Sequence, residues 1–256
     1  NARHKFSNTN ATQAQDFWQN FYLNAQETND KTSYWKMQNT LGVQLIEGFQ
    51  KWAKFGLSAY ASYEIRKYTQ MTDSVTMLSP LPDGLTPLPQ GVIVDPKGTQ
   101  NLLWVGGRIT KQQGSILTYK ADAKFGLIGD VIGDIDISGD IATRFKLFGD
   151  TVSIKANGHF RNTAQPYLIQ HYISNNFAWD NDFGKTRSFK VGGELTIPWT
   201  RTIISAGFEN IQNHVKKKKN GLPAQEKDNI QVFSATLLQR IKFGIWNWDN
   251  SITYQT

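Results

Sequence analysis

The sequence predicts an all-β protein, an up-and-down antiparallel transmembrane β-barrel. Three observations lead to this fold class: long runs of alternating apolar and polar residues, no convincing helical periodicity, and connections that are short after every second strand. A period of two places successive side chains on opposite faces of a strand. The sequence therefore predicts strands that have one apolar face and one polar face.

Residues 133–150 show the alternation most clearly. Ile135, Ile137, Gly139, Ile141, Thr143, Phe145 and Leu147 share one face, and Asp134, Asp136, Ser138, Asp140, Ala142, Arg144 and Lys146 share the other. The same pattern predicts about eleven strands, at approximately 15–25, 33–47, 53–69, 101–110, 115–128, 133–147, 151–162, 186–197, 202–213, 229–242 and 245–256. Most are much longer than globular strands, which usually have about 5–6 residues. Their length suits membrane-spanning strands, which need about 9–11 residues.

The connections between these strands alternate in length. The long ones, at about 70–100, 163–185 and 214–228, all follow odd-numbered strands, whereas the links after even-numbered strands are short. In a meander, alternate links lie at opposite ends of the sheet, and tight turns at one end with long loops at the other are typical of outer-membrane barrels. We therefore expect residues 1–256 to form a single β-barrel domain or a fragment of one. Because bacterial single-chain barrels have even strand counts, eleven strands favour a portion of a larger barrel.

The two faces predict two sets of residues with different surroundings. The polar face carries both signs of charge, which suits a hydrated lumen. Its candidate lumen-lining residues are Lys120, Asp122, Lys124, Asp134, Asp136, Asp140, Arg144, Lys146, Lys155, Lys190, Glu194 and Glu209. Tryptophan favours the membrane–water interface, because its ring is apolar and its N–H can stay hydrated. The candidate aromatic girdle, near predicted strand ends, consists of Trp35, Trp52, Trp199, Trp246 and Trp248.

Several stretches carry a family resemblance. They read "KADAKFGLIGDVIGDIDISGDIATRFKLFGD", "GGELTIPWTRTIISAGFENIQNH" and "LPAQEKDNIQVFSATLLQRIKFGIWNWDNSITYQT". These stretches resemble the "Putative porin" family of Bacteroidetes outer membranes, most clearly from about residue 100 to residue 256. The resemblance implies an exported β-barrel in the bacterial outer membrane, in contact with lipid and lipopolysaccharide, whose full chain is longer than this one.

No motif in the sequence predicts catalysis, a cofactor or a metal site. Residues 134–139, "DIDISG", begin like a calcium-binding EF-hand loop, but position 12 of that loop holds Phe145 where Glu is needed. The four histidines occur singly, without the ligand spacing of a zinc site. No spacing selects a nucleophile among the many Ser and Asn residues. We therefore expect a protein that is not an enzyme and that holds no cofactor or metal.

The net charge of +7 and the long connections bear on partners. The aromatic residues lie mainly on the face opposite the lysines, so we expect no groove for nucleic acid. Lys216–Lys219 form a basic loop that is either a solvated tip or a contact for anionic lipid head groups. The segment 70–100 is too long for a turn, and we expect it either to fold inward and constrict a pore or to project toward an envelope protein partner.

Three functions follow from the sequence as hypotheses. The first is a porin-like barrel that gives small polar solutes passive passage. The second is a plugged barrel that serves as a scaffold or partner in an envelope complex. The third is a soluble β-sandwich or lipocalin-like binding protein, in which the apolar face would be a protein core. The sequence leaves the solute and the oligomeric state open.

Overall fold

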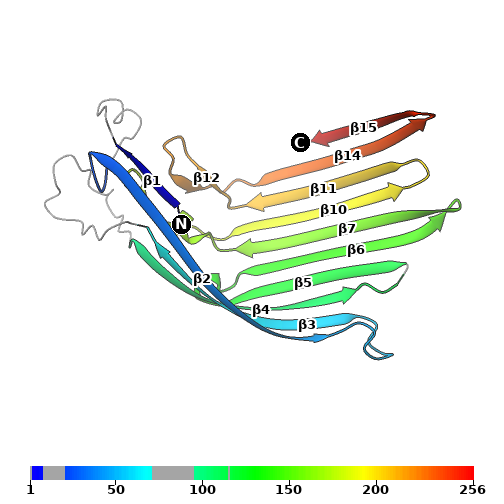
Figure 1. The fold of residues 1–256 in the computed structure, drawn as a ribbon, viewed down its shortest axis with the longest axis horizontal. Coiled ribbons are helices and arrows are strands. Elements are labelled where there is room, and N and C mark those ends of the chain that lie inside the picture. Colours follow the sequence, from blue (N-terminus) through cyan, green and yellow to red (C-terminus); the bar gives the residue numbers. More distant parts are fainter. Residues whose placement is uncertain (1, 8–20, 71–94, 115) are drawn as a thin grey trace.

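The computed structural model describes residues 2–7, 21–70, 95–114 and 116–256. Within them, eleven strands form one antiparallel sheet in chain order (Figure 1). These strands are β1 (Ala2–Ser7), β2 (Glu27–Leu45), β3 (Gly56–Thr69), β4 (Lys97–Lys111), β5 (Leu117–Ile128), β6 (Ile135–Leu147), β7 (Asp150–Thr163), β10 (Thr186–Ile197), β11 (Thr202–Gln212), β14 (Ile230–Phe243) and β15 (Trp246–Gln255). Each strand pairs with its neighbours in this order, which confirms an all-β, up-and-down antiparallel fold of the barrel class.

Short elements lie in the connections at one end of this sheet. They are η1 (Gly129–Val131), α2 (Tyr167–Gln170), β8 (His171–Ile173), β9 (Ala178–Asp180), β12 (Val215–Lys217) and β13 (Pro223–Gln225). We call this the long-loop end. The opposite end, where the links after β2, β4, β6, β10 and β14 contain no helix or strand among the described residues, we call the short-turn end. The structure thus has the difference between the two ends of the sheet that the lengths of the connections predict. No helix in the described residues is both long enough and apolar enough to cross a membrane.

The strand registers give the sheet one polar and one apolar face. On the polar face Lys124 of β5 lies opposite Asp136 of β6, and on the other face Ala123 lies opposite Ile137. Because a slip of one residue would exchange the two faces, the ladders hold every strand to one parity. The alternation of the sequence therefore becomes a surface property that extends across neighbouring strands.

Burial is the reverse of that in a soluble protein. On the apolar face Phe125, Ile137 and Val191 are 41%, 42% and 42% exposed. On the polar face Leu102 is fully buried and Trp104 is only 6% exposed. No second layer of described residues covers the apolar face, so the sandwich alternative, in which that face would be a core, is wrong for this structure. An apolar surface of this extent marks a membrane or an interaction site.

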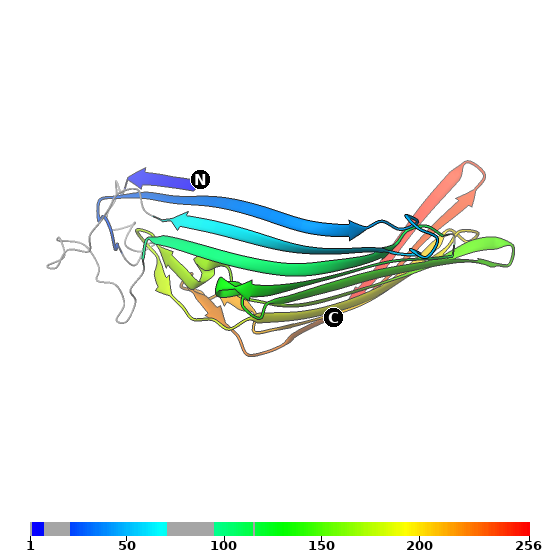
Figure 2. The same cartoon turned by 90° about the horizontal axis from the view of Figure 1, so that it is seen from below.

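The sheet is strongly curved. Figure 2 shows it as a trough in which β2, β3 and β4 lie across from the strands that follow later in the chain. The polar face lines the inside of this trough, because the buried side chains of β3 and β4 belong to that face. In the described residues β1 and β15 form the two edges and no ladder joins them. A larger, even-stranded barrel therefore stays a prediction.

Two strand assignments from the sequence need correction. Residues 21–25 of the expected strand 15–25 are not in a strand, and its residues 15–20 lie outside the described residues. The first strand of the sheet is β1, and β2 starts at Glu27 instead of 33. Residues 27–32, "ETNDKT", lack alternation. A ladder that continues past the apolar band needs no such pattern, because its outer face no longer meets lipid tails.

Candidate functional site

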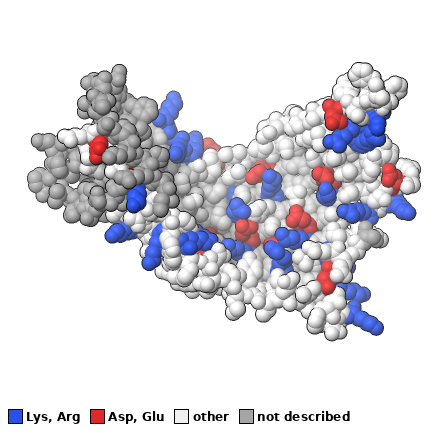
Figure 3. All heavy atoms as spheres, in the orientation of Figure 1, with Lys and Arg blue, Asp and Glu red and all other residues white. Residues whose placement is uncertain are grey.

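The candidate lumen-lining residues gather on one face. The registers of β5, β6, β7, β10 and β11 place on the polar face Lys120, Asp122, Lys124, Asp136, Asp140, Arg144, Lys146, Lys155, Lys190, Glu194 and Glu209. Figure 3 shows acidic and basic side chains intermixed over the middle of the sheet. Asp134 differs from this set, because it is only 2% exposed at the base of the long-loop end. The other residues remain candidates for lining a lumen.

Ion pairs connect neighbouring strands across this face. Asp122 contacts Arg108, and its second oxygen lies 3.3 Å from Lys120. The remaining ion pairs on the middle strands are Asp136–Arg161 at 3.3 Å, Lys155–Glu194 at 2.8 Å and Lys190–Glu209 at 3.6 Å. Asp136 also lies 2.8 Å from a ring nitrogen of His159. Such solvent-exposed pairs contribute only about 0–1 kcal/mol each. Their main consequence is that most carboxylates of the face are locally neutralised.

The unpaired charges on this face are mostly positive. Among the described residues, Asp140 is the polar-face carboxylate without an ion pair, whereas the cations without one include Arg144, Lys146 and Lys242. These three cations lie toward the short-turn end of β6 and β14. The polar face therefore carries a residual positive charge near that end.

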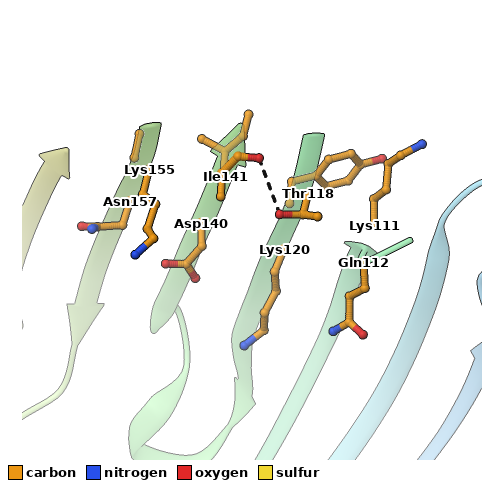
Figure 4. A pocket seen from close by; sticks show the side chains of 11 residues that line it. Lys111, Gln112, Thr118, Lys120, Asp140, Ile141, Lys155 and Asn157 are labelled. Carbon is orange, nitrogen blue, oxygen red and sulfur yellow. Dashed lines mark hydrogen bonds between the residues drawn. The ribbon is translucent and has the colours of Figure 1, made fainter. Parts of the chain in front are cut away.

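A shallow cavity of about 240 Å³ lies over part of this face. Figure 4 shows Lys120, Asp140 and Lys155 extending to the same side of three neighbouring strands, with Ile141 directed to the other side. Across this cavity the side-chain charges alternate from strand to strand, positive, negative and positive, on an open surface of the sheet. Such a surface can pass hydrated solutes, but its charges do not converge on one point as those of a catalytic centre do.

A buried carboxylate anchors the polar face of β2 and β3. The Glu64 side chain is only 3% exposed and accepts hydrogen bonds from Arg66 at 2.5 Å and 2.9 Å. Lys36 of β2 lies 3.3 Å from its other oxygen. On the adjacent strands the Lys124 ammonium lies 3.8 Å from the centre of the Trp104 ring. A single buried carboxylate thus balances two partly buried cations.

We predict that Glu64→Gln lowers the free energy of unfolding by about 2 kcal/mol, because two partly buried cations lose their counter-charge. The matched change Glu194→Gln removes a pair whose two side chains are 56% and 35% exposed, and it should cost less than about 1 kcal/mol. Denaturant titration in detergent, followed by tryptophan fluorescence, measures both. Equal losses for the two variants would contradict a special role for Glu64.

The connection between β7 and β10 folds back over the polar face. We call residues 164–185 the inward segment. Asn175 in this segment is 1% exposed and accepts backbone hydrogen bonds from Leu23 at 3.1 Å and Asn24 at 2.7 Å. Its amide donates to Thr28 at 3.0 Å, and its backbone N–H donates to Asp30 at 2.8 Å. A loop that starts at β7 is therefore bonded to β2, across the intervening strands of the sheet.

Further contacts hold the inward segment against β3 and the residue that follows it. Gln70, 1% exposed, donates to the carbonyl of His171 at 3.3 Å and accepts from the N–H of Ile173 at 3.0 Å. The Tyr167 ring stacks on Tyr68 of the polar face with a centroid distance of 4.3 Å. Figure 2 shows these short elements inside the trough at the long-loop end. The segment therefore narrows that end of the trough.

The base of the inward segment is fixed by the buried Asp134. Its carboxylate lies 2.6 Å from the Lys185 ammonium and accepts the backbone N–H of Ala164 at 2.9 Å. Lys185 also donates to the carbonyl of Ile132 at 2.5 Å. Both ends of the segment are thus tied to the start of β6, which explains why Asp134 is shielded from water.

The candidate girdle tryptophans are all exposed. Four of them lie at the short-turn end: Trp52, Trp199, Trp246 and Trp248. Trp35 lies on the apolar face of β2, toward the long-loop end. Lys67 stands over the Trp35 ring at 5.7 Å. Contact of these rings with a membrane interface stays a prediction.

Sequence reasoning missed Leu102 and Trp104. Both are large apolar residues on the polar parity of β4, and with Val131 of η1 they form a small buried cluster. A side chain on Gly126 would overlap Val131, so this glycine lets η1 fold into the trough. Large apolar residues at two polar-face positions break the alternation of β4. This break was the signal in the sequence that another apolar group, here Val131 of η1, packs on the polar face.

Other sequence hypotheses have different outcomes. Most of the segment 70–100 lies outside the described residues, and β4 begins at Lys97. Lys216 and Lys217 end β12, and Lys218 and Lys219 begin the turn to β13. All four are exposed, and Lys216 lies 3.1 Å from Glu226. Within the described residues no group of three His, Asp or Glu side chains lies close enough to hold a metal ion.

The exposed apolar face, the charged inner face and the asymmetric connections define an outer-membrane-type β-barrel protein. A family model described as "Putative porin" matches residues 1–256, and the chain belongs to this family. The family places the protein in the bacterial outer membrane with a porin-like role. A search of curated proteins found no match.

Proposed function

We propose that the protein is a passive channel that gives small polar solutes a hydrated path along the polar face of its strands. The observation that carries this proposal is the reversed burial, in which Ile137 and its neighbours are exposed while charged residues line the trough. Lipid tails can cover the apolar face, and water with dissolved solutes can fill the space along the charged face. The inward segment would set the narrowest part of the path.

Planar-bilayer recording tests the proposal. Protein extracted in detergent, with folding checked by heat-modifiable migration in electrophoresis, is added to one side of the membrane. Stepwise increases in current of uniform size are expected. Folded protein that inserts without any current would contradict passive passage.

A second candidate is a plugged barrel that acts as a scaffold in an envelope complex. The fixed position of the inward segment favours it, because buried Asn175 and Gln70 hold that segment in the trough. Silent insertion of the folded protein, together with recovery of an envelope protein bound to its long-loop end, would support this function over the channel.

We predict a weak preference for anions, because on the polar face the cations without an ion pair outnumber the carboxylates without one. The double change Arg144→Gln and Lys146→Gln should reduce the reversal potential measured in a salt gradient, toward the value of an unselective pore. Lys218→Gln with Lys219→Gln removes the same charge from an exposed hairpin tip and should change little at moderate salt, where screening acts over about 10 Å. An unchanged reversal potential in the first pair would contradict the prediction.

A further inference from the structure

A recess lies between the inward segment and the sheet at the long-loop end. It has a volume of about 550 Å³, within the range of small-molecule sites. We call it the acidic recess; its walls include Gln100, Asp130, Tyr167, His171, Asp180 and Asp182. It is distinct from the row of charges on the middle strands, because β4, η1 and the inward segment build it.

The charge in this recess is negative, in contrast with the net charge of the chain, +7. Asp130, Asp180 and Asp182 are all exposed and contribute three carboxylates. Lys185 also lines the recess, but its ammonium is bound to the buried Asp134, and Asp180 contacts a ring nitrogen of His171 at 2.5 Å. Asp130 and Asp182 have no ion pair among the described residues. Burial and then the charges of Asp95 and Asp180 raise the pKa of the Tyr167 hydroxyl, which therefore stays neutral at pH 7. The recess thus attracts cations.

A separate observation indicates a hydrogen-bond donor as ligand. Gln100 is only 9% exposed, and its amide nitrogen donates to Asp130 at 2.5 Å. Its amide oxygen is buried and has no hydrogen-bond partner in the described part of the chain. A buried acceptor without a donor is costly, so a ligand N–H that reaches this oxygen is favoured.

We propose that the acidic recess binds a small organic cation through primary ammonium groups. An ammonium supplies the positive charge that the carboxylates attract and three N–H donors for Gln100 and Asp130. The aromatic wall of Tyr167, stacked on Tyr68, accommodates the methylene chain of such a molecule. Binding is independent of conduction, whereas entry of the bound cation into a lumen rests on the proposed channel function.

Calorimetric titration of the detergent-solubilised protein with 1,5-diaminopentane tests this inference. Saturable binding with one molecule per chain is expected at low ionic strength. Pentane-1,5-diol, which has the same length without charge, should bind at least about tenfold more weakly, equivalent to about 1.4 kcal/mol. Equal affinity of the diol, heat without saturation, or tighter binding of Mg²⁺ than of the diamine would overturn the proposal.

Variants locate the site. Asp130→Asn combined with Asp182→Asn should weaken diamine binding about tenfold or more, and Gln100→Met should weaken it although the carboxylates remain. Asp228→Asn removes an exposed carboxylate outside the recess and should leave the affinity unchanged. Heat-modifiable migration confirms folding of each variant.

The outcomes separate the two proposals. If Asp228→Asn weakens diamine binding as much as the recess variants do, the diamine does not bind in the acidic recess. Binding without conduction would refute only the channel, and conduction without binding would refute only the recess.

Discussion

Replacing Ile137 by arginine is expected to destabilise the protein in a lipid bilayer by about 2–4 kcal/mol, the cost of a cation at mid-depth on the lipid face of a barrel. Ile137 lies in the middle of β6, opposite Ala123 and Phe160, and is 42% exposed. Equilibrium unfolding of protein in phospholipid vesicles, followed by tryptophan fluorescence, measures the loss. The effect is large because lipid tails cannot solvate a guanidinium group.

The neighbouring position supplies the control. Ser138 belongs to the same strand but to the polar face, where it lies opposite Asp122 and His159. Ser138→Arg places the same cation in a hydrated, charged environment and should cost less than about 1 kcal/mol. Similar losses for the two variants would contradict the assignment of the apolar face to lipid. A greater loss for Ser138→Arg would mean that the faces have been exchanged.

The sequence predicted the strands well where one face meets lipid and the other meets water. In β6 and β10 every second residue must be apolar, so the pattern is strong and the boundaries agree with the structure to within a few residues. The same physics explains the failure at β1 and at the start of β2. There the strands pair without an apolar face. The sequences of β1, "ARHKFS", and of the first residues of β2, "ETNDKT", therefore show no alternation of apolar and polar residues.

The inward segment could not be predicted for a different reason. Its position depends on single long-range hydrogen bonds, such as those of Asn175 to Asn24 and Thr28, which leave no periodic trace in the sequence. The sequence indicated a long connection at 163–185 but no inward fold for it, and it offered an inward fold only as one of two alternatives for 70–100. The acidic recess was missed likewise, because Gln100, Asp130 and Asp182 are far apart in the chain and converge only after the segment has folded back.

Removing most of the inward segment is expected to raise the single-channel conductance severalfold. The variant replaces residues 167–183 with a short Gly-Ser link between β7 and β10. The ladder of these strands, from Thr163–Thr186 to Ser153–Thr196, does not involve the removed residues, so the sheet should still form. The expected gain arises because the segment that packs on Tyr68, Gln70 and Thr28 no longer narrows the trough. Planar-bilayer recording at fixed salt compares the variant with the unaltered chain.

A matched shortening at the opposite end separates narrowing from general disturbance. The turn Gly48–Ala53 lies between β2 and β3 at the short-turn end, and replacing it with a two-residue link should leave conductance nearly unchanged. Equal conductance of the unaltered chain and the variant without the inward segment would show that this segment does not limit the path. A silent unaltered chain beside a conducting variant would instead identify the segment as a plug and favour the scaffold function, because only its removal would then open the lumen.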